Sequence, residues 1–165
     1  MNIDIGSGEV VYGDVGFTYA EDKAVDRHIT AYDAWLDREF GIRPNPNAPV
    51  HQYLDPEDIF LTLQTMAVYD AVALFKHSIE HMDCPLEYIR AVKPFVSTII
   101  VITPNAATNN ADYVDHTHVY AWLSPTMNNF LGRALGVGWT VSERVDVERE
   151  VTNGRDLVFI ARKNE

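Results

Sequence analysis

Two runs of apolar residues near the middle of the chain have the length and composition of buried β-strands. The first run spans Val68 to Phe75, and the second spans Thr98 to Thr103. Between them lie a polar loop, His77 to His81, and a predicted short helix from Pro85 to Val92. Strands that are joined by a helical crossover run parallel, so these segments predict a βαβ unit.

The N-terminal part of the chain has a weaker pattern. Residues 2 to 8 (NIDIGSG) predict a short strand that ends in a glycine turn. Residues 9 to 23 do not predict a helix, because glycine, β-branched and aromatic residues disfavour one there. We expect a loop that leads into a strand near Asp14 to Tyr19, and the segment Ala24 to Asp26 is a rival end for that strand.

The segment 29–40 predicts an amphipathic helix. Its apolar residues fall on one helical face, and Gly41 supplies a stop signal. The following stretch, 43–49, is rich in proline and asparagine and predicts a surface loop. Val50 to Leu54 then predicts a short strand that ends at Asp55-Pro56, and Glu57 to Met66 is expected to form a loop or a short helix.

A long polar loop and a helix follow the central βαβ unit. The loop, Ala106 to His118, is long for a compact domain, and loops of this length are usually functional or mobile. The helix is expected to start with Ser124 as its N-cap and Pro125 at its first position. Gly136 and Gly138 are expected to end it.

The C-terminal end of the chain predicts an antiparallel pair of strands. The strands span Trp139 to Val147 and Leu157 to Ala161, and Thr152-Asn-Gly154 between them is a strong hairpin signal. The whole pattern predicts a single α/β domain over residues 1–165. Its sheet is expected to be mostly parallel, with a C-terminal antiparallel hairpin.

Composition and charge narrow the classes of function. The chain has 165 residues and a net charge of −11, which argues against broad contact with a nucleic-acid backbone. No apolar run approaches the roughly 20 residues of a membrane span. Cys84 is the only cysteine, so no internal disulfide forms and a cytoplasmic setting is expected.

Polar residues gather at the predicted carboxyl ends of the buried strands. His77, Glu80 and His81 follow the first run of the βαβ unit, and Asn105 follows the second. Ligands of parallel α/β sheets bind outside these strand ends. The glycine turn at Gly6 and Gly8 follows the first strand, where a residue without a side chain lets a ligand approach the backbone.

The order of these elements resembles the class I S-adenosylmethionine-dependent methyltransferases, most closely the small-molecule group similar to methyltransferase type 11. The segments that carry the resemblance are Asp4-Ile-Gly6-Ser-Gly8, His77-Ser-Ile-Glu80-His81-Met-Asp-Cys-Pro85, Arg90-Ala-Val-Lys93-Pro, Ile99 to Asn105, and His118 to Pro125. They cover nearly the whole chain, and the Glu-His block is much more specific than the glycine turn. The resemblance implies a Rossmann-like methyltransferase fold with helices on both faces of the sheet.

The resemblance also implies S-adenosyl-L-methionine as the cofactor. The glycine turn, Gly6-Ser7-Gly8, would lie against the methionine part, with Asp4 nearby. An acid after the second strand would bind the ribose hydroxyls, because a carboxylate accepts hydrogen bonds from a diol. Asp26 is at the family's usual distance for this acid, and Glu21 and Asp22 are alternatives.

For the adenine ring, the resemblance implies a site at the ends of the third and fourth strands. Asp55 matches the acid near the adenine amino group, and Pro56 and Glu57 would flank the ring. The end of the fourth strand, Phe75 to His77, would line the other side of the cofactor.

Methyl transfer from a sulfonium requires alignment of the acceptor and, for some acceptors, removal of a proton. The residues expected to serve catalysis are His77, Glu80, His81 and His118, with His116 as a further candidate base. The alternative is that Glu80 and His81 hold the loop and the start of the helix. No resident metal is expected, although Glu80 with neighbouring histidines has the composition of a Glu/His metal site.

The chain departs from the family pattern in three places. Val10 replaces the third glycine, the segment after Lys93 has no glycine, and Met1 stands directly before the first strand. The chain therefore resembles a compact form without the N-terminal cover helix. If the crossover helix between the first two strands is also absent, one face of the sheet would be covered mainly by residues 29–40, so a homodimer or a partner subunit is expected to cover an open apolar face.

Two functions follow from this sequence. The first is transfer of a methyl group from S-adenosylmethionine to a small-molecule or protein acceptor, with no nucleic acid and no membrane involved. The second is a catalytically inactive, methyltransferase-like binding or scaffold protein. The departures in the N-terminal half favour the second function, and the Glu-His block favours the first.

Overall fold

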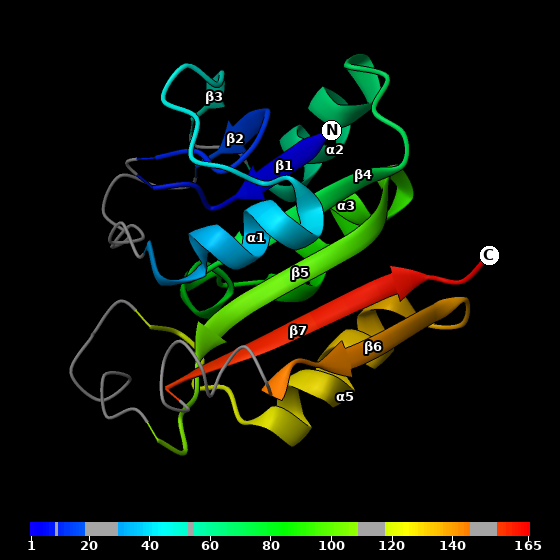
Figure 1. The fold of residues 1–165 in the computed structure, drawn as a ribbon. Helices are drawn as coiled ribbons and strands as arrows, with labels where there is room; N and C mark the ends of the chain where they lie inside the picture. Colours follow the sequence, from blue (N-terminus) through cyan, green and yellow to red (C-terminus); the bar gives the residue numbers. More distant parts are fainter. Residues whose placement is uncertain (9, 19–29, 53–54, 109–117, 146–154) are drawn as a thin grey trace.

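A mixed β-sheet forms the centre of the computed structural model, which describes residues 1–8, 10–18, 30–52, 55–108, 118–145 and 155–165 (Figure 1). Its strands are β1 (Asn2–Ile5), β2 (Val15–Phe17), β3 (Val50–His51), β4 (Ala71–Lys76), β5 (Val96–Pro104), β6 (Trp139–Glu143) and β7 (Asp156–Lys163). The strand order is β3-β2-β1-β4-β5-β7-β6. The first five strands in this order pair in parallel, and β7 pairs antiparallel with both β5 and β6. The predicted fold class is confirmed.

Helices cover both faces of this sheet, as expected. They are α1 (Asp33–Phe40), α2 (Pro56–Thr65), α3 (Pro85–Val92) and α5 (Ser124–Leu135), with 3-10 turns at Thr30–Tyr32, Ile79–His81 and Lys93–Phe95. Figure 1 shows α1 on one face and the other three helices behind the sheet. None of the helices in the described parts of the chain has the length and hydrophobicity of a membrane span.

Alternate residues of the central strands contribute their side chains to two separate hydrophobic clusters, one on each face of the sheet. Along β5, Ile99 and Val101 pack under α2, α3 and α5, whereas Ile100 and Ile102 pack under α1. This alternation follows from the two-residue period of a strand. The strands β4 and β5 are therefore apolar on both faces, which explains why their sequences read as continuous apolar runs.

The connection between β1 and β2 is too short for a crossover helix. Only nine residues, 6 to 14, separate the two parallel strands, whereas such a crossover usually needs about a dozen or more. Val11 and Tyr12 are buried, and Tyr12 joins the cluster under α1. The predicted cover from residues 29–40 is present as α1, and Tyr12 adds to it on the same face.

Several predicted boundaries change. β4 begins at Ala71 instead of Val68, because Ala67 and Asp70 have positive φ values of 51° and 54° that interrupt an extended strand. β5 starts earlier and ends later than predicted. The segment 57–66, for which a loop or a short helix is expected, is helical up to Thr65, in helix α2 that starts at Pro56.

The start of α5 also differs from the prediction. The N-cap is Leu123, and Ser124 is the first helical residue. The hydroxyl of Thr126 donates to the Leu123 carbonyl and accepts from its N–H, whereas Ser124 donates to Glu143 at 2.6 Å. β6 ends at Glu143, before the predicted end at Val147. The hairpin signal at 152–154, the rival strand end at 24–26, and Tyr53 and Leu54 lie outside the described residues.

The sheet face under α1 does not present the apolar surface that we expected a partner to cover. Its buried residues in β4, β5 and β7 are apolar, and its exposed end carries Thr140, Ser142 and Arg162. A homodimer or partner subunit stays a prediction, but it no longer follows from this face.

The close approach of Ser7 and Val11 to β2 can be tested at Gly16. A Cβ atom at this position would lie 2.6 Å from Val11 Cγ2 and 2.7 Å from Ser7 Oγ. Gly16→Ala is therefore expected to lower the free energy of unfolding by about 1–3 kcal/mol, measured by urea denaturation. The control is Gly132→Ala in α5, where a new Cβ meets nothing within 4 Å, and which should be neutral or stabilising by up to about 1 kcal/mol. Equal effects of the two substitutions would contradict this packing.

Candidate functional site

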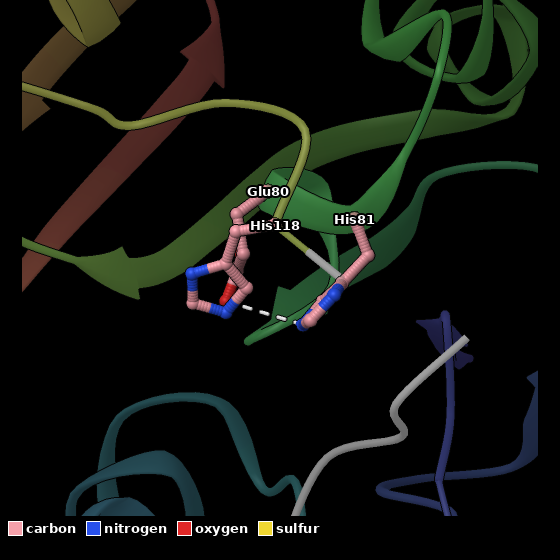
Figure 2. A group of neighbouring side chains, drawn as sticks. All are labelled: Glu80, His81 and His118. Atoms are coloured by element: carbon pink, nitrogen blue, oxygen red, sulfur yellow. Dashed lines mark ion pairs between the residues drawn. The ribbon is translucent and has the colours of Figure 1, made fainter. Parts of the chain in front are cut away.

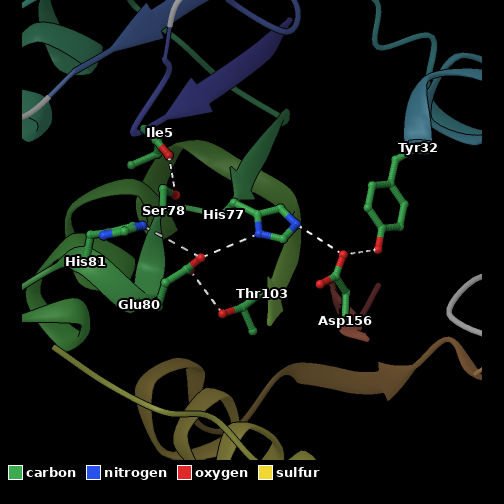
Figure 3. A network of polar contacts seen from close by, with 8 residues as sticks. All are labelled: Ile5, Tyr32, His77, Ser78, Glu80, His81, Thr103 and Asp156. Atoms are coloured by element: carbon green, nitrogen blue, oxygen red, sulfur yellow. Dashed lines mark hydrogen bonds and ion pairs between the residues drawn. The ribbon is translucent and has the colours of Figure 1, made fainter. Parts of the chain in front are cut away.

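The loop after β4 lies at the carboxyl edge of the sheet, beside the point where the strand order reverses between β1 and β4. His77 turns the chain there with a φ of 49°, and its N–H donates to the Ile102 carbonyl at 2.8 Å. The Ser78 hydroxyl donates to the Ile5 carbonyl at 2.7 Å and so ties the loop to the end of β1. The 3-10 turn Ile79–His81 follows and presents Glu80 (Figure 3).

His77 lies between two carboxylates. Its Nε2 is 3.2 Å from Asp156 Oδ2, and its Nδ1 is 3.6 Å from Glu80 Oε1. The Tyr32 hydroxyl donates to the same Asp156 oxygen at 2.5 Å, so three elements meet at this carboxylate (Figure 3). The imidazole is thus held in one orientation by contacts on both ring nitrogens.

Glu80 is the most deeply buried acid of the site, with 1% of its surface exposed. Its Oε2 accepts a hydrogen bond from Thr103 Oγ1 at 3.0 Å, whereas its Oε1 is buried without a hydrogen-bond partner. Burial raises the pKa of Glu80 above its ordinary value, and the nearby His77 and His118 offset only part of that rise. The protein therefore holds a carboxylate oxygen that is costly to leave unsatisfied.

His81 and His118 complete this group. His81 is buried and His118 is partly exposed, and their rings meet edge to face with centroids 4.6 Å apart. The N–H groups of Val119 and Tyr120 both donate to the Glu80 carbonyl, at 2.8 and 3.1 Å, which brings His118 to Glu80. One ligand atom each from Glu80, His81 and His118 lies within 4.8 Å of the other two (Figure 2).

The structure thus brings together all four residues that the sequence nominated for catalysis: His77, Glu80, His81 and His118. His116, the further candidate base, lies outside the described residues.

The glycine turn after β1 is closed by its own contacts. The N–H groups of Gly6 and Ser7 both donate to the Phe17 carbonyl, at 2.7 and 3.0 Å. Asp4 is 2% exposed, and its Oδ2 accepts from the Tyr12 N–H at 2.8 Å. Ser7 Oγ is buried without a hydrogen-bond partner, and Gly8 is partly buried. In this conformation Gly6 and Ser7 do not offer their N–H groups to a cofactor.

Asp55 is exposed and forms the N-cap of α2, where its Oδ1 accepts from the Asp58 N–H at 2.9 Å. The open pocket beside it has a volume of about 420 Å³ and lies between α2 and α3, lined by Asp55, Pro56, Glu57, Phe60, Glu87, Arg90 and Ala91. The two residues expected at the adenine ring, Asp55 and Pro56, therefore share a concave surface.

Phe75, a further predicted cofactor contact, is not at a surface. Phe75 is wholly buried in the cluster under α2 and α3, so a contact with the cofactor would require its neighbours to move. Asp26 and the alternatives Glu21 and Asp22 lie outside the described residues.

Two residues of this edge, Asp156 and Tyr32, were not predicted from the sequence, and Lys76 was predicted only as part of the range Phe75 to His77. Asp156 opens the apolar strand β7, and because β7 is antiparallel to β5, its first residue lies beside Pro104 at the carboxyl end. Tyr32 directly precedes α1, and the sequence predicted it only as part of the apolar face of a helix over residues 29–40. Lys76 ends β4 with 2% of its surface exposed, and its Nζ lies 4.0 Å from the centroid of the Tyr12 ring. A charged residue at the start of an apolar run is the signal that could have found Asp156.

The fold and this edge define a Rossmann-like domain of the methyltransferase type. No protein-family model and no curated protein matches the sequence. A SAM-dependent methyltransferase from Archaeoglobus fulgidus is similar in structure, with a TM-score of 0.59 and 15% identity over 98% of this chain and 85% of that chain. The plantazolicin methyltransferase BamL, solved with a desmethylPZN analog and SAH, has a TM-score of 0.61 and 10% identity over 99% and 77%.

A third similar structure is a putative methyltransferase in complex with the Haloferax volcanii Trm112 methyltransferase activator. Its TM-score is 0.56, with 8% identity over 99% of this chain and 82% of that chain. The structural neighbours are SAM-dependent methyltransferases matched over nearly the full chain, which confirms the fold that the sequence resemblance implied.

The contact between Tyr32 and Asp156 can be tested without changing the core. Tyr32→Phe keeps the buried ring and removes a hydrogen bond to a buried carboxylate, so we expect a loss of about 1.5–3 kcal/mol in the free energy of unfolding. The control is Tyr120→Phe, whose hydroxyl makes an exposed 3.2 Å hydrogen bond to the Asp83 carbonyl and should change stability by no more than about 0.5 kcal/mol. Urea denaturation of both variants measures the difference, and a Tyr32→Phe variant as stable as the parent would contradict the assignment.

Proposed function

We propose that this protein is an S-adenosylmethionine-dependent methyltransferase that acts on a small-molecule or protein acceptor. The observation that carries the proposal is the group of His77, Glu80, His81 and His118 at the carboxyl edge of a methyltransferase-type sheet. Ligands of this sheet type bind at that edge, next to the strand-order reversal.

The charge of this edge supports the proposal. Asp4 in β1, Glu80 in the turn after β4 and Asp156 at the start of β7 are buried carboxyl groups. A sulfonium cofactor is a cation, and opposite charges in a partly desolvated site attract more strongly than in water. An acidic edge therefore suits a positively charged methyl donor better than an anionic one.

The proposed role of His77 is removal of a proton from the acceptor. The bound cofactor would supply the methyl group, and the protein's own residues would position the acceptor and receive its proton. His77 Nε2 faces the Asp156 carboxylate at 3.2 Å, which favours the ring proton on Nε2. Nδ1, which lies 3.6 Å from Glu80 Oε1, is then the ring atom that we propose receives the acceptor's proton. Asp156, held by Tyr32, is then a positioning residue.

The closed glycine turn favours a second candidate function. In this conformation the N–H groups of Gly6 and Ser7 donate to the Phe17 carbonyl, and the Asp4 carboxylate accepts from the Tyr12 N–H. The turn therefore does not fit a cofactor in the way that the resemblance implies. A binding or scaffold protein that keeps the methyltransferase fold without catalysis needs no open turn. The two candidates differ in whether S-adenosylmethionine binds and reacts.

Calorimetric titration with S-adenosylmethionine and S-adenosylhomocysteine distinguishes the methyltransferase function from the scaffold function. The methyltransferase proposal predicts saturable binding of both compounds, and, with a suitable acceptor, release of S-adenosylhomocysteine. Absence of binding at millimolar ligand would overturn it and leave the scaffold function.

The position of the adenine site can be tested at Asp55. Asn is as good an N-cap as Asp, so Asp55→Asn keeps the helix start and removes the charge. We expect the affinity for S-adenosylmethionine to fall about tenfold, because a hydrogen bond to a charged group is lost, while the melting temperature is unchanged. Asp58→Asn, a change of an exposed acid in the same helical turn, is the control and should bind as the parent does. If Asp55→Asn also binds as the parent does, the adenine site is elsewhere.

We also retain a partner subunit or homodimer, and a cytoplasmic setting, as proposals. The Haloferax neighbour was solved with an activator protein, and this supports a partner for the present chain by analogy of fold alone. Sedimentation of the purified chain at micromolar concentration tests the homodimer, and a stable monomer would remove it.

A further inference from the structure

The group formed by Glu80, His81 and His118 has the composition and geometry of a metal site. We propose that it binds one divalent first-row transition-metal ion through Glu80 Oε1 and one ring nitrogen of each histidine. The absence of a metal was the expectation from the sequence, and the structure gives reasons to revise it. The proposal does not depend on methyltransferase activity.

The spacing of the three ligand atoms suits a single ion. Three points within 4.8 Å of one another fit inside a circle of radius 4.8/√3, or about 2.8 Å. Metal–nitrogen and metal–oxygen bonds in such sites are about 2.0–2.2 Å, so each ligand needs to move inward by less than about 1 Å. Side-chain rotation is sufficient for a movement of this size. Figure 2 shows the three side chains converging from the turn after β4 and from the segment that carries His118.

Glu80 is prepared to serve as a ligand. Thr103 Oγ1 fixes Oε2 at 3.0 Å, which leaves Oε1 buried, without a hydrogen bond, on the side of the histidines. His81 Nε2 is 4.0 Å from this oxygen. A buried carboxylate oxygen without a partner is unfavourable, and a cation would satisfy it. A second-sphere hydrogen bond such as that from Thr103 is typical of metal-binding carboxylates.

His118 is held in place by the backbone. The Val119 and Tyr120 N–H groups donate to the carbonyl of Glu80 itself, so one residue supplies both the carboxylate and the anchor for the second histidine. Because His118 is partly exposed, it also marks the side from which an ion can enter.

The ligand set decides the class of metal. Two imidazoles and one carboxylate suit Zn²⁺, Fe²⁺, Co²⁺ or Mn²⁺, whereas Mg²⁺ and Ca²⁺ prefer oxygen ligands. Three protein ligands leave at least one position for water or for a substrate atom. Such an ion would lie at the edge where we place the methyl acceptor.

The test measures Zn²⁺ binding to the full, tag-free chain after removal of bound metal. Calorimetry is expected to give one high-affinity ion per chain, with no comparable binding of Mg²⁺. His118→Gln and Glu80→Gln should each weaken Zn²⁺ binding at least about tenfold. The matched controls are His51→Gln, a histidine stacked on Phe17 away from the site, and Glu87→Gln, an exposed acid of α3, and both should bind as the parent does.

Co²⁺ provides a readout that does not rely on the variants. The parent protein loaded with Co²⁺ is expected to show visible absorption bands of a nitrogen- and oxygen-ligated ion of low coordination number, and Zn²⁺ should displace them. The proposal is overturned if the parent binds no Zn²⁺ at concentrations on the order of 100 µM. It is also overturned if folded His118→Gln and Glu80→Gln proteins bind as the parent does, which would place the ion at other residues. Circular dichroism of each variant establishes that it is folded.

Discussion

The carboxyl edge of this protein depends on the burial of one carboxyl group, that of Glu80. Its carbonyl accepts two N–H groups from the segment after His118, and its Oε2 accepts the hydroxyl of Thr103 at the end of β5. Through these contacts a single residue joins the loop after β4, strand β5 and the connection to α5. The same burial leaves Glu80 Oε1 without a hydrogen-bond partner, and a buried oxygen of this kind indicates a role beyond holding the fold together.

The charges around Glu80 have to be balanced within a small volume. His77 contacts both Glu80 and Asp156, and the Tyr32 hydroxyl donates a hydrogen bond to the Asp156 carboxylate. The buried carboxyls of this edge belong to a chain with a net charge of −11, so repulsion between them is not relieved by the surface as a whole. A cation at this edge, either a metal ion or a sulfonium, would reduce that repulsion. The two proposals therefore draw on one electrostatic feature, the buried carboxyl groups of this edge, and Glu80 contributes to both.

Local sequence signals predicted the elements well and the contacts between them poorly. The limits of α3 follow from Pro85 and the apolar spacing after it, and the parallel pairing of β4 and β5 follows from two apolar runs with a helix between them. The pair Tyr32–Asp156 is separated by 124 residues, and it depends on where β7 begins. No local pattern specifies such a contact. The glycine turn is the converse case, because Gly6 and Gly8 predict a ligand-facing loop but do not reveal that the Phe17 carbonyl accepts the N–H groups.

The closed turn does not by itself decide between a catalyst and a scaffold, and magnitudes explain why. Opening it exchanges the two hydrogen bonds from Gly6 and Ser7 to one carbonyl, each worth about 1 kcal/mol net, for bonds to a ligand. A ligand with micromolar affinity gains about 8 kcal/mol on binding. The turn is therefore a small barrier to cofactor binding unless the Asp4–Tyr12 contact and the packing of Val11 on β2 must also give way. Because the nine-residue connection is too short for a crossover helix that could absorb such a movement, we infer that the packing of Ser7 and Val11 on Gly16, rather than the glycine hydrogen bonds, decides whether this fold admits its expected cofactor.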